Sequence, residues 1–186
     1  IVHLKSLWTK KDLLIYEALF FLMTKYKVMG ETKIKSKGIF NVEDLYVELY
    51  LWFKHYGYVW SEIEYRKIMF PGGGYRLEIV WMGKKNLNDY NTFQIHLILG
   101  ADVKGDVEVQ LEGGKKVKRQ QATLEFKSWG DLYTNDKIWK GRTFGKQMQK
   151  VYEIMTKDRL EQYKEDTYIE ISKLYDELKA FLIINK

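Results

Sequence analysis

The chain has 186 residues and a formal charge of +6, and 46% of its residues are hydrophobic. That composition excludes a wholly disordered chain and predicts one globular domain with an additional element. Cysteine is absent, which excludes disulfides, cysteine-ligated zinc and a thiol nucleophile, and fits the reducing cytoplasm where we expect the protein. The excess of positive charge allows contact with nucleic acid or anionic lipid.

A nearly apolar run at Leu13–Met23 predicts a helix near the N-terminus. The run is too short to cross a bilayer, which takes about 20 residues, and the bulky, basic Thr24–Lys27 does not resemble a signal-cleavage site. Because most of the helix surface is apolar, we expect burial, with a second copy of the chain or a membrane interface as alternatives. Gly30 would end this helix, so residues 1–29 form a helical extension of a single α+β domain at 30–186.

The domain is predicted to begin with a short strand at Lys33–Phe40 and a helix that follows it directly. Asn41 is a good N-cap, and Asp44 lies three residues further on, as in a capping box. Apolar residues then recur at helical spacing as far as Tyr56, and Gly57 ends the helix.

From Tyr58 onward the hydrophobic period changes to two, which predicts an antiparallel meander. The expected strands are Val59–Met69, Tyr75–Met82, Tyr90–Leu99, Val107–Leu111 and Gln121–Lys127, joined by turns at 71–74, 84–89, 100–105 and 113–114. If Met69 lies opposite Tyr75, Arg66 faces Glu78 and the charged residues stay on the outer face. The inner face would then continue through Phe93, Ile95, Leu97, Leu99, Val107, Val109, Leu111, Ala122, Leu124 and Phe126.

Two helices are predicted at the end of the chain. Thr143–Lys157 carries one apolar stripe, formed by Phe144, Met148, Val151 and Met155. Asp158 looks like a fresh cap, so a second helix is expected from Arg159 to about Ile183. We therefore expect five to six antiparallel strands packed on a long C-terminal helix.

This order of strand, helix, meander and long terminal helix resembles the helix-grip arrangement of START-like lipid-binding and polyketide-cyclase proteins. The resemblance covers residues 33–184 and rests on element order alone, with one helix where those families have two after the first strand. It implies a hydrophobic ligand between the curved sheet and the last helix, and it allows no functional residue to be carried over.

Candidates for catalysis are few. The histidines, His3, His55 and His96, lack the spacing of a metal site, and no serine lies in a nucleophile-elbow context. Three carboxylates, Glu62, Glu64 and Glu78, come closest to an acid–base pair. The preferred register points all three outward, whereas a slip of one residue would bring them into the core with Arg66. We expect no catalytic role, no metal and no cofactor.

Two basic clusters are candidate sites for nucleic acid or another anionic partner. One comprises Lys115, Lys116, Lys118 and Arg119 at a hairpin tip, and the other comprises Lys140, Arg142 and Lys146 near a helix start. The outer face of the sheet is a poor nucleic-acid platform, because acidic residues outnumber basic ones there.

The leading hypothesis is therefore a soluble, non-catalytic protein that binds an apolar or aromatic small ligand between the sheet and the C-terminal helix. The residues expected to line that site are Trp81, Phe93, Ile95, Leu124, Phe126, Leu174 and Leu178. Two alternatives stay open. One is binding of nucleic acid or an anionic partner at the basic clusters, and the other is an assembly role in which residues 13–23 join copies of the chain.

Overall fold

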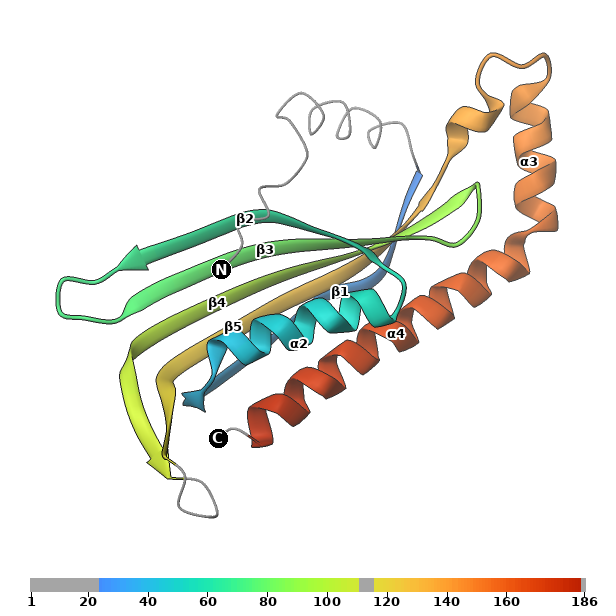
Figure 1. Ribbon diagram of the computed structural model, residues 1–186. Helices are drawn as coiled ribbons and strands as arrows, with labels where there is room; N and C mark the ends of the chain where they lie inside the picture. The colour runs from blue at the N-terminus through green and yellow to red at the C-terminus, as the bar shows by residue number, and fades with distance from the viewer. Residues whose placement is uncertain (1–23, 111–115, 185–186) are drawn as a thin grey trace.

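The computed structural model describes residues 24–110 and 116–184, and Figure 1 shows one curved sheet with helices on one of its faces. The fold is α+β, with a five-stranded antiparallel sheet and a long C-terminal helix. Along the chain the elements are β1 (Thr24–Phe40), α2 (Val42–His55), β2 (Val59–Met69), β3 (Tyr75–Asn86), β4 (Asn91–Gln110), β5 (Lys116–Thr134), the 3-10 helix η1 (Asp136–Trp139), α3 (Gly145–Met155) and α4 (Lys157–Ile184).

The strands lie in the order β1-β5-β4-β3-β2, so β2 to β5 form the expected meander and β1 pairs with the last of them. Several boundaries differ from the sequence-based prediction, among them those of β5, which runs from Lys116 to Thr134 instead of from Gln121 to Lys127, and the end of β3, which reaches Asn86 instead of Met82. Residues 24–29 belong to β1, although they were expected in the N-terminal extension. Residues 100–105, expected as a turn, continue β4, because their backbone pairs with β5 on one side and, up to Val103, with β3 on the other. The predicted helix Leu13–Met23 lies outside the described residues.

The predicted register of β2 against β3 is confirmed from Glu64 to Met69, with Arg66 opposite Glu78 and Met69 opposite Tyr75. A β-bulge then shifts the register between Glu62 and Glu64, so that Glu62 lies opposite Trp81. Since directly opposed residues of an antiparallel pair share a face, Glu62 is turned to the inner face. The expectation that all three carboxylates point outward is thus wrong for this one.

A second register shift lies in β4, between Val103 and Gly105. Beyond it, Val107 pairs with Arg119 and Asp106 with Gln120. Alternation along β5 from the buried Ala122 therefore leaves Val107 and Val109 on the outer face, contrary to the prediction. Leu111, the third residue expected there, lies outside the described residues.

Two helices, α2 and α4, cover the inner face of the sheet (Figure 1). Helix α2 begins where predicted, because the Asn41 side chain accepts hydrogen bonds from the backbone N–H groups of Glu43 and Asp44. Helix α4 buries Ile171, Leu174 and Leu178 against the sheet. No helix in the described part of the chain is long and apolar enough to span a bilayer.

Close approach of the helices depends on two glycines of the sheet. A Cβ at Gly83 would collide with the Phe53 ring of α2, and one at Gly130 would collide with Ile171 of α4 and approach the Phe93 ring. Neither collision could be relieved by the far end of a flexible, exposed side chain, because Phe53, Phe93 and Ile171 are all buried. These two positions set how near the helix layer lies to the sheet.

Candidate functional site

The seven residues predicted to line a ligand site are brought together between the sheet and the helices, each at most 2% exposed. They pack against one another as part of the main hydrophobic core. A small hollow beside them lies between α2 and α4, where Trp52, Leu174 and Leu178 are among the lining residues, and its volume is about 30 Å³. That is about the space of a single water molecule, so in this conformation the seven side chains fill the interior.

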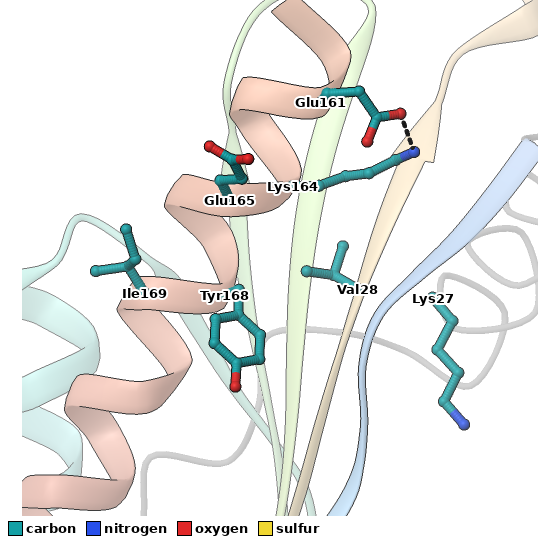
Figure 2. Close-up of a pocket in the computed structure, with 7 residues that line it drawn as sticks. All are labelled: Lys27, Val28, Glu161, Lys164, Glu165, Tyr168 and Ile169. Atoms are coloured by element: carbon teal, nitrogen blue, oxygen red, sulfur yellow. Dashed lines mark hydrogen bonds and ion pairs between the residues drawn. The ribbon is translucent and has the colours of Figure 1, made fainter.

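A larger groove lies elsewhere, on the surface between β1 and α4 (Figure 2). Its volume is about 420 Å³, and its lining combines Lys27 and Val28 with five residues of α4: Glu161, Lys164, Glu165, Tyr168 and Ile169. Lys164 bonds to Glu161 at 2.7 Å and lies over the Tyr26 ring. No residue predicted to bind a ligand lines this groove, and its mixture of opposite charges favours no particular ligand class.

The bulge in β2 creates a polar contact inside the helix-covered face. Glu62 accepts a hydrogen bond from the Tyr46 hydroxyl at 2.9 Å and another from Trp81 Nε1 at 3.1 Å. Burial, and next the hydrogen bond to Glu62, raise the pKa of Tyr46. The carboxylate therefore serves as the acceptor for two donors of the core, one of them on α2, which anchors that helix to the sheet.

A second anchoring contact, which the sequence did not reveal, joins α4 to the sheet. Glu170 accepts from the Tyr58 hydroxyl and pairs with Lys85 at 2.6 Å. Burial is the main cause that raises the pKa of Tyr58, followed by the hydrogen bond to Glu170. Glu62 and Glu170 thus each join a helix to the sheet.

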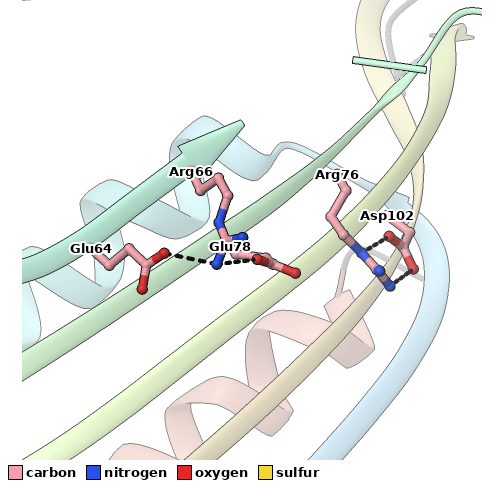
Figure 3. Close-up of polar contacts among 5 residues, drawn as sticks. All are labelled: Glu64, Arg66, Arg76, Glu78 and Asp102. Atoms are coloured by element: carbon pink, nitrogen blue, oxygen red, sulfur yellow. Dashed lines mark hydrogen bonds and ion pairs between the residues drawn. The ribbon is translucent and has the colours of Figure 1, made fainter. Parts of the chain in front are cut away.

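The other acidic residues that the sequence singled out lie outside the core. Arg66 bonds to Glu64 at 2.8 Å and to Glu78 at 3.2 Å, as Figure 3 shows. His96 lies on the outer face as expected, stacked on Trp129, and burial lowers its pKa. Within residues 24–110 and 116–184, no three His, Asp or Glu side chains form a group that could hold a metal ion. His3 and Lys115 lie outside the described residues.

The two basic clusters lie at opposite ends of the molecule (Figure 1). From Arg119, strand β5 continues for 15 residues to Thr134, about 50 Å at the usual rise per residue, and η1 follows before Lys140. In the hairpin cluster, Arg119 pairs with Asp44 at 3.1 Å and Lys116 lies 3.8 Å from Glu108. Because of this separation and pairing, the two clusters do not form one continuous surface.

The second basic cluster belongs to a projecting segment, residues 136–155, which we call the arm and which comprises η1 and α3 (Figure 1). The less exposed side of its helix is formed by Gly145, Gln149 and Tyr152, and Thr156 directly follows the helix. Tyr152 packs against the rings of Tyr90 and Trp139. The apolar stripe predicted for this helix is instead exposed to solvent: Phe144 is 70% exposed and Met155 80%, and Met148, Val151 and Ile154 are all more than half exposed.

Positive charge is concentrated in the same stretch of chain as this exposed apolar stripe. Residues 140–159 contain six basic and two acidic residues, and the basic ones are Lys140, Arg142, Lys146, Lys150, Lys157 and Arg159. All six are exposed, and none forms an ion pair with another described residue. The segment thus contributes four of the six net charges of the whole chain.

The start of α3 also has an unusual backbone. Phe144 has a φ of 63°, and among the described residues it is the one non-glycine with a positive φ. A bulky residue rarely adopts this conformation because of steric strain. The helix also lacks a side-chain N-cap and has no acidic residue in its first turn. Phe144 therefore lies at the surface in a strained conformation, and neither a capping hydrogen bond nor burial of its ring offsets the strain.

No protein-family model matches the chain, and no curated protein matches it. Its own residues are the basis of any functional assignment.

Proposed function

We propose that the protein binds the surface of an anionic membrane through the arm, as a peripheral binding module. The observation that supports this most directly is the orientation of α3, which exposes its apolar stripe while the Tyr152 ring packs against Tyr90 and Trp139. Amphipathic helices with basic residues and an apolar side lie in the membrane interface, with the apolar side chains below the headgroups. Positive charge near the surface adds about 1 kcal/mol per lysine or arginine on anionic lipid.

Lipid fits this surface better than nucleic acid or a second copy does. A phosphate backbone would use the six basic residues but would leave the aliphatic stripe in water. Two copies meeting through the stripe would bring two strongly basic segments together, and like charges repel across such an interface. An anionic bilayer offers a hydrocarbon layer for Met148 and Met155 and negative charge for the basic residues of the same stretch of chain.

The test is partitioning of the full chain onto phosphatidylcholine vesicles with and without phosphatidylserine. We expect binding to the vesicles that contain phosphatidylserine, weakening as salt is raised, because screening reduces the electrostatic attraction. Met148→Gln with Met155→Gln keeps the length and helix propensity of the side chains but removes apolar area, and should weaken partitioning about tenfold or more. Lys146→Gln with Lys150→Gln should weaken it by a similar factor.

Each variant has a matched control. Met69 is 66% exposed on β2, so Met69→Gln removes a similarly exposed methionine outside the arm. Lys116→Gln with Lys118→Gln removes two lysines from the hairpin at the far end of β5. Equal losses in arm and control variants, or no wild-type binding at low salt, would contradict the proposal. Salt-sensitive binding to DNA that ignores the methionine variants would assign the arm to nucleic acid instead.

An apolar ligand between the sheet and α4 stays a second hypothesis, supported by the aromatic and aliphatic side chains gathered there. It requires α2 and α4 to move apart, because the hollow between them holds about 30 Å³. Native mass spectrometry tests it: bound mass of a few hundred daltons that is lost on denaturation supports it, and a bare chain does not. The cytoplasmic location expected from the lack of cysteine likewise stays a prediction.

A further inference from the structure

Strand β2 is an edge of the sheet, and among the described strands it pairs on one side only, with β3. It is 11 residues long, so it presents a row of backbone N–H and C=O groups that no described strand satisfies. The opposite edge, β1, carries Lys33, Lys35 and Lys37, and closely spaced lysines discourage strand addition. The edge at β2 has no such run of one charge.

Apolar side chains are exposed along this same edge. Ile63 is 46% exposed and Tyr65 54%, and Val59, Ile68 and Met69 are also exposed. A free edge that also bears exposed β-branched and aromatic side chains favours pairing with another strand.

The charges along β2 indicate which strand fits. Acidic residues, Glu62 and Glu64, occupy its first half, and basic residues, Arg66 and Lys67, its second half. When such a strand pairs antiparallel with a copy of itself about Tyr65, Glu64 of each copy lies opposite Arg66 of the other. Moving the twofold axis to Glu64 or to Arg66 would instead oppose two glutamates or two arginines, which destabilises the pair.

We infer that two copies of the chain pair antiparallel along β2, with the twofold axis at Tyr65, and so join their sheets into one. A symmetric pairing of this kind uses the same patch on both copies. Glu64 and Arg66 already bond to each other within one chain at 2.8 Å (Figure 3). In the dimer the two ion pairs lie side by side and form a network of four alternating charges.

The first test is the mass of the full chain in solution, measured by light scattering and sedimentation equilibrium at low ionic strength. The wild type should be a dimer, and Glu64→Arg should raise the dissociation constant at least tenfold, because arginines then oppose each other. In that variant Arg66 can still bond to Glu78, so it keeps an ion-pair partner within its own chain. Adding Arg66→Glu to Glu64→Arg reverses both charges and should restore the dimer.

The matched control is a charge pair on the same sheet face but away from the edge. Arg76 and Asp102 bond to each other at 2.7 and 3.0 Å between β3 and β4 (Figure 3). Exchanging them, as Arg76→Asp with Asp102→Arg, should leave the dimer unchanged. A monomeric wild type, or a dimer that Glu64→Arg does not weaken, would overturn the inference.

A second test locates the twofold axis by disulfide cross-linking. Because the chain has no cysteine, an introduced cysteine can pair only with its copy in the other chain. Tyr65→Cys lies opposite itself at the proposed axis, where facing Cα atoms are about 5 Å apart and a disulfide can form. Ile68→Cys lies three residues from the axis, so its two copies are about 20 Å apart and should not cross-link. Cross-linking of Ile68→Cys but not of Tyr65→Cys would overturn the proposed register. Both tests are independent of membrane binding, since neither involves the arm.

Discussion

The two C-terminal helices carry similar apolar stripes and put them to opposite uses. In α4, the stripe through Ile171, Leu174 and Leu178 is buried against the sheet. In α3, directly before it in the chain, the stripe through Met148 and Met155 is exposed, and the Tyr152 ring packs against Tyr90 and Trp139. Hydrophobic periodicity thus predicts a helix but does not say what covers its apolar side.

The difference has a physical origin in what each helix lies beside. Helix α4 runs along the sheet, where Gly130 lets it approach closely and Glu170 anchors it to Tyr58 and Lys85. Helix α3 stands at the end of the molecule beside η1, where Tyr90 and Trp139 offer two rings to Tyr152 (Figure 1). Removing apolar groups from α4 should therefore change stability, and removing them from α3 should change binding.

The largest effect is expected in the core of α4. Leu174 is 1% exposed, so Leu174→Ala removes buried methyl groups and leaves a cavity. The variant should lose about 2–5 kcal/mol of unfolding free energy. Urea denaturation followed by circular dichroism measures this, and a loss below about 0.5 kcal/mol would show that α4 is not packed as described.

The next effect comes from the sheet position on which α4 rests. Gly130→Ala places a methyl group where the side chains of Ile171 and Phe93 lie, and the overpacking should cost about 1–3 kcal/mol of unfolding free energy. Gly105 is the matched control, because a Cβ there meets nothing within 4 Å. If Gly130→Ala and Gly105→Ala have equal midpoints in urea, the close approach of α4 is wrong.

A smaller effect is expected at the start of α2. Asn41→Ala removes the acceptor of two backbone N–H groups, those of Glu43 and Asp44, and should cost about 1 kcal/mol. Asn41→Asp retains an acceptor and should keep most of that stability. Thermal unfolding compares them, and equal losses in both variants would argue against a capping role.

The smallest effect on stability is expected in α3. Met148→Gln with Met155→Gln should change the unfolding free energy by no more than about 0.5 kcal/mol, because both side chains are exposed. The same double variant is thus expected to bind vesicles more weakly while its unfolding free energy stays nearly unchanged. A large destabilisation would mean that the stripe is covered within the chain, and the contrast with α4 would disappear.

The sequence predicted the parts of the fold that follow from local rules. The boundaries of β2 agree with the structure, the register from Glu64 to Met69 is correct, and Asn41 caps α2. The prediction fails at the two bulges, where one extra residue reverses the faces of Glu62 and of Val107. No residue pattern announced either bulge, because a bulge depends on the partner strand as well as on the local sequence.

The candidate site was less predictable than the fold. The sequence identified the stripe of α3 and the basic residues Lys140, Arg142 and Lys146, but it treated them as separate features. Whether Met148 and Met155 are exposed depends on how the arm is placed relative to the sheet. That placement is a feature of the tertiary structure, which the local sequence does not predict. The partners of Glu62 and Glu170 were missed for the same reason, since both contacts join residues far apart in the chain.

The most direct test of the central claim, that the stripe of α3 meets lipid, uses a single introduced cysteine carrying an environment-sensitive fluorophore. Met155→Cys places the label on the stripe, and Ile183→Cys places it on α4, where Ile183 is 73% exposed. On adding vesicles that contain phosphatidylserine, we expect a blue shift in emission at position 155 and none at position 183. Unchanged emission at position 155 while the protein sediments with the vesicles would contradict it.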